Sequence, residues 1–239
     1  MILRTEKLFK KYKYRTVVNG VSINVKQGEI VGLLGPNGAG KTTTFYMTVG
    51  LIKPHEGNVY LDEIEITNRA MYQRARLGIG YLSQEPSIFR GLSVEDNLVS
   101  IAQTLPISKF EQKKKVNMLL EDFGLTKLCR QLSVTLSGGE KRRLEIARSL
   151  ITDPKFLLLD EPFVGIDPIT VDDIQKIIKM LKEKGLGILI TDHNVRETLE
   201  IIDRAYIIYD GEILLDGNVE ELLKNSNARR IYLGDNFKM

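Results

Sequence analysis

The sequence predicts an α/β fold in which the strands of a parallel sheet alternate with helices. Short, uniformly apolar runs at 30–34, 156–159 and 187–190 are typical of strands that are buried on both faces of such a sheet. Helical patterns lie between and after them, at about 41–50, 111–122, 139–151, 170–184 and 195–202. A glycine-rich segment joins the first apolar run to the first helical pattern, which is a third feature of this class.

The composition is that of an ordinary globular protein. The 239 residues include 34 Lys and Arg against 31 Asp and Glu, and a net charge of +3 is too small to indicate a nucleic-acid partner. Cys129 is the only cysteine, which excludes an internal disulfide. No apolar stretch approaches the ~18 residues of a membrane span, and charges between Arg4 and Lys13 interrupt any signal-peptide core. We expect a cytoplasmic protein that serves a membrane only as a peripheral subunit.

The N-terminal part is predicted to be rich in strands and the middle to be helical. Segments 17–25 and 58–66 alternate apolar and polar residues, as half-buried strands do. Residues 88–150 contain no strong strand pattern. We therefore expect an α/β core at 1–87 and 151–222, a helical subdomain inserted at 88–150, and a C-terminal tail at 223–239. The apolar and aromatic residues of this tail could pack on the core or reach a partner.

The glycine-rich segment fits the pattern G-x-x-x-x-G-K-[ST] at every fixed position. It consists of Gly35, Pro36, Asn37, Gly38, Ala39, Gly40, Lys41 and Thr42. Glycines let backbone N–H groups close around phosphate oxygens, and the following helix directs its positive end at the anion. The lysine of such a loop reaches the β- and γ-phosphates, and the threonine binds Mg²⁺. Because an apolar run precedes the loop and a helix follows it, we favour a phosphate-binding loop over a chance turn.

Two carboxylates end the apolar run at 156–159. Ligands of a parallel sheet bind at the carboxyl ends of its strands, where Asp160 and Glu161 are expected. Asp160 is therefore placed to hold Mg²⁺, and Glu161 to polarise an attacking water. The alternative is a solvated strand end with two surface acids, which the complete phosphate loop disfavours.

A second glycine motif, Leu136-Ser137-Gly138-Gly139-Glu140, precedes the helix that is predicted at 139–151. Ser137 and Glu140 have the spacing of a capping box. Three cations, Lys141, Arg142 and Arg143, follow in the first turn, where they oppose the helix dipole. The motif fits either an ordinary capped helix or an anion site, and an anion site would serve a nucleotide that another copy of the chain holds.

Taken together, these motifs resemble those of the ABC-type ATPases. The phosphate loop, the 136–140 motif and the acidic pair occur in the order of the Walker A, signature and Walker B motifs, and Leu136 lies 24 residues before Asp160. Further matches are Gln84 to the Q-loop glutamine, Asp167 to the D-loop aspartate, His193 to the switch histidine and Tyr12 to the aromatic that stacks on adenine. The resemblance implies a P-loop (RecA-like) core, with ATP and Mg²⁺ as ligands.

The family also implies a role for each matched residue. Glu161, His193 and Gln84 would be catalytic, and Thr42, Gln84 and Asp160 would bind the metal. Tyr12, the loop residues Gly35 to Thr42, and Thr43 would bind the nucleotide, together with Ser137, Gly138, Gly139, Glu140 and Asp167. Two copies would sandwich two ATP head to tail, so that each nucleotide lies between the Lys41 loop of one chain and the Ser137–Glu140 motif of the other. Tyr12 could instead be an ordinary surface tyrosine.

Within the family, the residues between the motifs most resemble those of the ATPase subunits of bacterial lipopolysaccharide exporters. The matching segments are 42–47, 78–89, 92–98, 192–199 and the tail at 232–237. Ser83 and Val164 depart from the usual proline and alanine, at positions with no assigned role. ATPases of branched-chain amino-acid importers share the Tyr-Leu-Gly of the tail and are the main alternative. Soluble ABC-type ATPases that act on nucleic acid or ribosomes are a further one, but they usually carry long coiled-coil insertions or two cassettes.

The resemblance also implies that the dimer lies under two membrane subunits. Phe89 and Arg90 follow the Q-loop, in the stretch where the coupling helices of such subunits dock. An exposed aromatic beside an arginine suits an interface anchor. The alternative is that Phe89 is a core residue.

Overall fold

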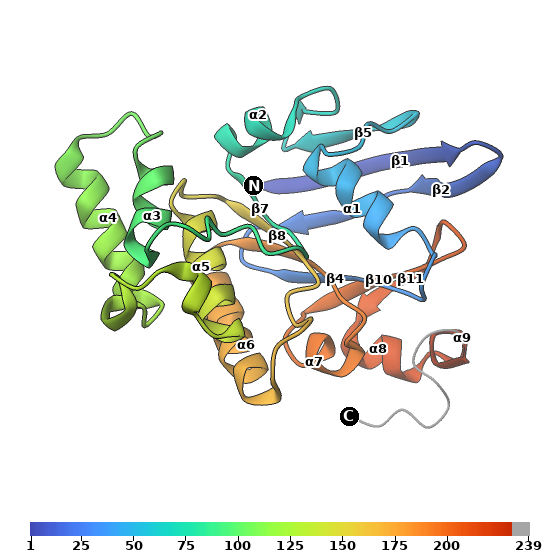
Figure 1. The fold of residues 1–239 in the computed structure, drawn as a ribbon. Coiled ribbons are helices and arrows are strands. Elements are labelled where there is room, and N and C mark those ends of the chain that lie inside the picture. The colour runs from blue at the N-terminus through green and yellow to red at the C-terminus, as the bar shows by residue number, and fades with distance from the viewer. Residues whose placement is uncertain (231–239) are drawn as a thin grey trace.

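The computed structural model describes residues 1–230, and its central layer is a six-stranded sheet (Figure 1). Five neighbouring strands of this sheet are parallel, and β11 pairs antiparallel with β10 at one edge. The order across the sheet is β11 (Glu212–Asn218), β10 (Arg204–Tyr209), β4 (Ile30–Leu34), β9 (Gly187–Thr191), β8 (Phe156–Asp160) and β7 (Ile79–Leu82). The predicted α/β class and the three apolar strands are confirmed.

A second, antiparallel sheet forms the strand-rich N-terminal part. Its strands are β2 (Arg15–Val21), β1 (Ile2–Tyr12), β5 (Glu56–Leu61) and β6 (Ile64–Glu65), and β3 (Asn24–Lys26) also pairs with β1. The helix α1 (Lys41–Val49) contacts strands of both sheets and lies between them.

The central sheet is buried on both faces, as its apolar strands predict. Along β8, Phe156 and Leu158 face the core that α1 and the antiparallel sheet share. Leu157 and Leu159 face the opposite core, which the helices build. Because successive side chains of a strand alternate between faces, a strand in the middle layer must be apolar throughout.

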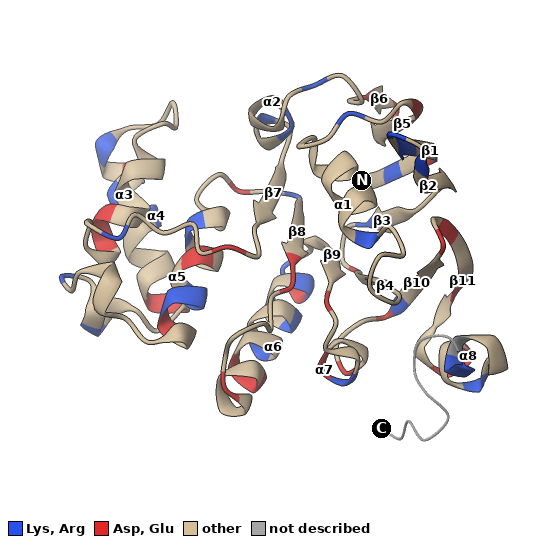
Figure 2. Cartoon of the chain, turned by 45° about the vertical axis from the view of Figure 1, so that its right-hand side comes forward, with Lys and Arg blue, Asp and Glu red and all other residues tan. Residues whose placement is uncertain are grey.

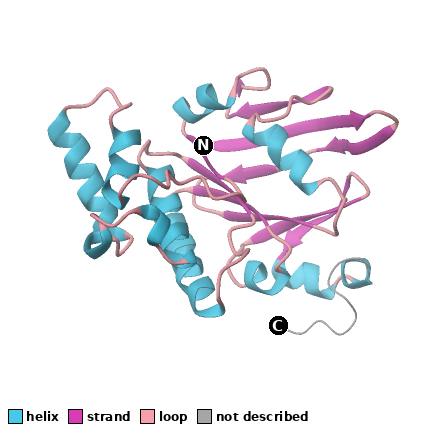
Figure 3. Cartoon of the chain, viewed as in Figure 1, coloured by secondary structure: helices cyan, strands magenta, loops and turns pink. Residues whose placement is uncertain are grey.

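Helices cover the other face of the central sheet (Figure 3). The stretch 88–150 forms α3 (Val94–Ala102), α4 (Lys109–Asp122) and α5 (Gly138–Leu150), with short 3₁₀ turns at Thr126–Leu128 and Ser133–Thr135. The remaining helices are α2 (Met71–Arg76), α6 (Pro168–Glu183), α7 (Val195–Leu199), α8 (Val219–Lys224) and α9 (Ser226–Ala228). Leu98 of α3 and Leu144 of α5 belong to the same core as Leu157, so the helical stretch and the sheet share one apolar interior.

Three strand predictions differ from the structure. The segment predicted as one strand at 58–66 is two strands, because the chain turns at Asp62, whose φ is +50°. The segment at 17–25 is likewise divided into β2 and β3. Strand β1 was not predicted, because Lys7, with a φ of +46°, interrupts the alternation of buried and exposed residues along it. Before Lys7 the odd-numbered Leu3 and Thr5 are buried, whereas after it the even-numbered Leu8 is buried.

The domain boundaries proposed at 87, 151 and 222 stay predictions. The part of the predicted tail that follows Arg230 lies outside the described residues. Within residues 1–230, no helix is both long and apolar enough to cross a membrane.

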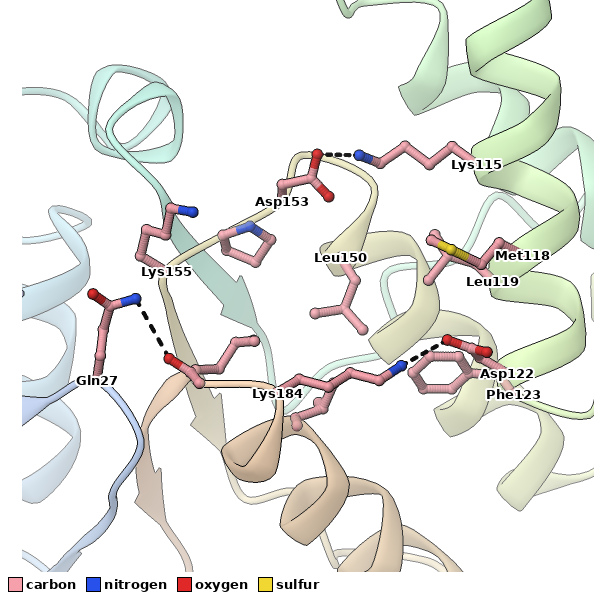
Figure 4. Close-up of a pocket in the computed structure, with 14 residues that line it drawn as sticks. Gln27, Lys115, Met118, Leu119, Asp122, Phe123, Leu150, Asp153, Lys155 and Lys184 are labelled. Carbon is pink, nitrogen blue, oxygen red and sulfur yellow. Dashed lines mark hydrogen bonds and ion pairs between the residues drawn. The ribbon is translucent and has the colours of Figure 1, made fainter.

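Two ion pairs join α4 to the rest of the chain around a pocket of about 240 Å³ (Figure 4). Lys115 pairs with Asp153 in the loop before β8, and the Nζ of Lys184, which follows α6, lies 2.8 Å from the Oδ2 of Asp122. The apolar side chains of Leu119, Leu150 and Leu186 are among those that line this pocket. These pairs lie at the edge of the apolar interior, where solvent reduces their strength.

Arg74 in α2 is a buried cation, 1% exposed, at the C-terminal end of α1. Its guanidinium donates to the carbonyl oxygens of Met47 at 3.0 Å and Thr48 at 2.6 Å, and also to those of Thr67 and Arg69. Burial lowers the pKa of Arg74 to about 10, so the group is still charged at neutral pH. A cation at a helix C-terminus is favoured by the helix dipole, and this one also fixes α2 to the helix that follows the phosphate loop.

We expect Arg74→Ala to lower the free energy of unfolding by about 3 kcal/mol, because it leaves buried carbonyl oxygens without donors. In a chain of this size the melting temperature should fall by roughly 6–12 °C. The exposed Arg76, two residues further along α2, is the matched control, and Arg76→Ala should change stability by less than about 0.5 kcal/mol. Thermal melting followed by circular dichroism measures both. Equal melting temperatures for the two variants would show that Arg74 does not stabilise this junction.

Candidate functional site

The phosphate loop connects β4 to α1, at the carboxyl end of the central sheet. Lys41 is the first residue of α1, and its Nζ donates to the carbonyl oxygens of Gly35 at 2.7 Å and Pro36 at 3.0 Å. Burial lowers the pKa of Lys41, while the charge of Glu161 acts in the opposite direction. The ammonium group is thus held inside the loop by neutral acceptors, which an anion can replace as a stronger partner.

Two glycines of the loop are required because other strands pass very close. A Cβ atom on Gly35 would lie 2.1 Å from the carbonyl oxygen of Ile208 in β10. A Cβ atom on Gly40 would lie 2.5 Å from the carbonyl oxygen of Val17 in β2. Both residues also have positive φ, which glycine adopts without strain. The loop is therefore fixed between the two sheets.

A pocket of about 150 Å³ opens beside the loop. Six predicted loop residues line it together with Val17 and two predicted catalytic residues; the full set is Val17, Asn37, Gly38, Gly40, Lys41, Thr42, Thr43, Glu161 and His193. The predicted loop residues Gly35, Pro36 and Ala39 do not line this pocket, and Ala39 donates its N–H to the carbonyl oxygen of Pro36 within the loop. The structure thus brings the predicted phosphate loop and catalytic side chains together.

Asp160 ends β8 and offers a ligand for a cation. Its Oδ1 accepts a 2.8 Å hydrogen bond from the hydroxyl of Thr191. Its Oδ2 is buried and has no hydrogen-bond partner among the described residues. A buried carboxylate oxygen without a donor fits the hard, oxygen-preferring Mg²⁺, and the exposed hydroxyl of Thr42 provides a second oxygen.

Glu161 is where the three predicted catalytic residues meet. Its backbone has a φ of +48°, an uncommon conformation for this residue type, and its N–H donates to the carbonyl oxygen of Thr191 at 2.7 Å. The Oε2 of Glu161 accepts from Nε2 of Gln84 at 2.6 Å and lies 2.8 Å from Nε2 of His193. Residues from the ends of β7, β8 and β9 therefore converge on one carboxylate oxygen.

The electrostatics of this carboxylate suit a proton acceptor. Burial raises the pKa of Glu161, and the nearby charges of Asp160 and Asp192 raise it further, while His193 lowers it. A carboxylate with a raised pKa is a stronger base than an ordinary surface glutamate.

Asp192 holds the segment that carries His193. The Asp192 carboxylate is fully buried and accepts the N–H of Phe163 at 3.1 Å and the N–H of Asn194 at 2.7 Å. Burial raises the pKa of Asp192, although these backbone donors favour its charged form. This carboxylate connects the turn after β8 to the turn after β9, which positions Glu161 relative to His193.

The 136–140 motif forms a complete capping box at the start of α5. The Oγ of Ser137 accepts from the N–H of Glu140 at 3.3 Å, and the Oε2 of Glu140 accepts the N–H and the hydroxyl of Ser137, both at 2.8 Å. These bonds lower the pKa of Glu140. The motif packs against the start of α6, since a Cβ atom on Gly139 would lie 2.4 Å from Cγ2 of Thr170. A Cβ atom on Gly138 would lie 3.8 Å from the carbonyl oxygen of Gly165, in the loop before α6.

The motif and Asp167 do not line the pocket at Lys41. Asp167 caps α6: its carboxylate accepts the hydroxyl of Thr170 at 2.6 Å and the N–H of Thr170 at 3.0 Å, and these two bonds lower the pKa of Asp167. Tyr12, at the end of β1, is also outside the pocket lining; it is 46% exposed, with the ammonium of Lys10 5.6 Å from its ring centre.

Arg142 is a buried arginine that donates hydrogen bonds to several backbone carbonyls around the site, a role that the sequence analysis missed. From α5 it donates to the carbonyl oxygens of Ser83, Glu161 and Pro162 at 3.1–3.2 Å and of Asp160 at 3.4 Å. It also pairs with Glu145 at 3.1 Å, and Glu145 in turn accepts the N–H of Ser87 at 2.8 Å. The sequence signal was Glu145, a charge inside the apolar stretch from Leu144 to Ala147.

The segment after Gln84 is held by its backbone, while its aromatic side chain is left outside. Asn97 accepts the N–H of Phe89 at 2.8 Å and donates to the Phe89 carbonyl at 3.1 Å. The Phe89 ring is 47% exposed, and the guanidinium of Arg148 lies 4.9 Å from its centre. The alternative that Phe89 is a core residue is therefore wrong, and the exposed Arg90 lies beside it.

A parallel sheet with a lysine loop, a buried carboxylate and a glutamate at the carboxyl ends of its strands defines a P-loop nucleotide-binding protein. The model of the family described as ABC transporter matches residues 18–164. The lipopolysaccharide export system ATP-binding protein LptB of Escherichia coli K12 is 52% identical over 238 residues, which cover 99% of each chain. The chain belongs to the ABC transporter family, as an ATP-hydrolysing subunit.

Solved structures agree with this assignment. The ADP conformation of MJ1267, an ATP-binding cassette of an ABC transporter, matches with a TM-score of 0.87 and 31% identity over 98% of this chain and 99% of that one. The dimeric structure of MJ0796, a bacterial ABC transporter cassette, matches with a TM-score of 0.79 and 25% identity over 91% and 98%. The neighbours thus include a nucleotide-bound cassette and a cassette dimer.

We expect Arg142→Ala to reduce the rate of ATP hydrolysis at least tenfold, because Ser83 and Glu161 lose the donor that fixes their backbones relative to each other. Arg143→Ala is the matched control: within residues 1–230, the one hydrogen bond of its side chain is donated to the Phe123 carbonyl, and it contacts neither Ser83 nor Glu161. Steady-state phosphate release at saturating ATP measures both variants. Similar rates for the two would mean that Arg142 does not position the catalytic groups.

Proposed function

We propose that this chain powers the export of lipopolysaccharide from the inner membrane by binding and hydrolysing ATP, on the cytoplasmic face and as a peripheral subunit. The observation that carries the hydrolytic part is the convergence of Gln84 and His193 on the Glu161 carboxylate, at the mouth of the pocket that Lys41 lines. In this arrangement Glu161 takes a proton from water, while Gln84 and His193 hold the carboxylate in place and reach the γ-phosphate. This is general-base catalysis by a carboxylate that burial has made more basic.

The nucleotide would bind along the phosphate loop with its adenine on Tyr12. Backbone N–H groups of the loop and the Lys41 ammonium would hold the phosphates. Asp160, Thr42 and Gln84 would hold Mg²⁺, which neutralises phosphate charge when bound. The partnerless Oδ2 of Asp160 supports this assignment.

A second copy of the chain would complete the site. The Ser137–Glu140 motif and Asp167 lie outside the pocket at Lys41, yet both present helix N-termini, where N–H groups favour an anion. A head-to-tail dimer would bring them onto the partner's ATP. The dimeric MJ0796 cassette supports such an assembly.

The cargo assignment rests on likeness to a relative. LptB of Escherichia coli K12 is named for lipopolysaccharide export and matches over the full length of both chains, which favours export over a branched-chain amino-acid importer and over a soluble ABC-type ATPase. Two membrane subunits would dock at Phe89 and Arg90. The exposed ring, on a backbone that Asn97 holds firmly, supports an interface anchor.

We expect Glu161→Gln to bind ATP with wild-type affinity but to hydrolyse it at less than about a hundredth of the wild-type rate, since only the proton acceptor is lost. ATP and Mg²⁺ should then trap a dimer, which size-exclusion chromatography detects. The exposed Glu183→Gln, at the end of α6, is the control and should hydrolyse normally. A Glu161→Gln protein with the wild-type rate would remove Glu161 from the catalytic role.

We expect Phe89→Ala to leave the isolated subunit folded and active on ATP, yet to weaken its binding to the membrane subunits of the lipopolysaccharide exporter by more than about tenfold. Phe110→Ala is the matched control, because that ring is 78% exposed on α4, away from the Q-loop. A pull-down against the membrane subunits measures binding, and thermal melting checks folding. Unchanged binding by Phe89→Ala would exclude the anchor role. If the wild-type chain bound only the membrane subunits of an amino-acid importer, the importer assignment would replace the export assignment.

A further inference from the structure

The hairpin between β1 and β2 lies beside the phosphate loop. A two-residue turn, Lys13 and Tyr14, joins the strands, and Tyr12 is paired with Arg15 across the ladder. Side chains of directly paired residues project from the same face of a sheet. Arg15 therefore shares a face with Tyr12, the residue proposed to stack on adenine.

This face of the hairpin is directed at the phosphate loop. Val18 pairs with Lys10, two residues before Tyr12, so it lies on this face, and its Cγ2 lies 3.5 Å from the position of a Cβ atom on Gly40. At the end of the strand, Nη2 of Arg15 lies 3.8 Å from the position of a Cβ atom on Gly38, a loop residue of the pocket at Lys41. The Arg15 guanidinium is therefore next to the loop that holds the phosphates.

The Arg15 guanidinium has no protein partner within residues 1–230, either by hydrogen bond or by ion pair. Arginines with a structural role in this chain behave differently, since Arg74 and Arg142 each donate to several backbone carbonyls. A planar group with five donors, placed beside a phosphate loop and left unpaired, suits a phosphate ligand.

We propose that Arg15 binds phosphate oxygens of the nucleotide and, with Tyr12, closes the outer side of the binding site. The inference rests on the proposed function, because it requires ATP in the pocket at Lys41. Lys41 then holds the phosphates from inside the loop and Arg15 from the hairpin side. None of the motifs in the sequence marks this residue, since its position follows only from the strand pairing.

The test is titration calorimetry of the full chain with ADP and with a non-hydrolysable ATP analogue. Arg15→Ala should weaken both affinities about tenfold, because a charged hydrogen bond to phosphate is lost. Arg15→Lys should recover part of the loss by retaining the charge. The control is Lys11→Ala: Lys11 is exposed and precedes Tyr12, so it lies on the opposite face of the hairpin, and its affinities should match wild type within about twofold.

Salt separates binding from a structural role. Raising the salt to about 1 M should shrink the difference between wild type and Arg15→Ala, because the Debye length falls to ~3 Å. Melting temperatures should be equal, since Arg15 has no protein partner. The inference would be overturned if Arg15→Ala bound both nucleotides as tightly as Lys11→Ala does. It would also be overturned if the loss of nucleotide affinity came with a lower melting temperature. A wild-type chain that binds neither nucleotide would instead refute the proposed function.

Discussion

The guanidinium of Arg142 is the interaction on which the geometry of the site depends. It lies where the ends of β7 and β8 meet the start of α5, and it donates to carbonyl oxygens on both strand ends. Burying a charge is costly unless its donors are satisfied, and these carbonyls together with Glu145 satisfy it. The helix that begins with the Ser137 motif is therefore attached to the strand ends that carry the proposed catalytic residues. Glu145 extends the attachment to Ser87, and so to the segment that presents Phe89.

Opposite charges are distributed unevenly around the pocket. The acids Asp160, Glu161 and Asp192 lie at the ends of β8 and β9, whereas Lys41 is the cation inside the loop (Figure 2 shows the acidic and basic segments of the chain). Most of these groups have a partner within the chain: Lys41 has carbonyl oxygens, Glu161 has Gln84 and His193, and Asp192 has backbone N–H groups. The exception is the Oδ2 of Asp160. This unpaired oxygen suits one more cation, which in the proposed function is the Mg²⁺ bound to ATP.

Much of the fold could be predicted because the central sheet is buried on both faces. Uniform apolar runs identified β4, β8 and β9, and their carboxyl ends located Asp160 and Glu161. Strand β1 was lost because the Lys7 bulge reverses its alternation, and a pattern of period two does not survive such a shift. The motifs could identify Gln84 and His193 as site residues. They could not predict that both side chains contact the Glu161 carboxylate, because that contact depends on the order of the strands in the sheet. Arg142 was missed for the same reason, because most of the carbonyl oxygens that it contacts are far away in the sequence, and the place of Arg15 beside the phosphate loop likewise depends on the folded chain.

The attachment of α1 at its far end has a mechanical consequence. Arg74 holds the carbonyls of Met47 and Thr48, and the loop at the other end is fixed between β10 and β2 at Gly35 and Gly40. Helix α1 is therefore held in place at both of its ends. A displacement of the phosphate loop from the central sheet would have to break the contacts at one of these ends, so the loop, α1 and the strands that flank it form one rigid unit.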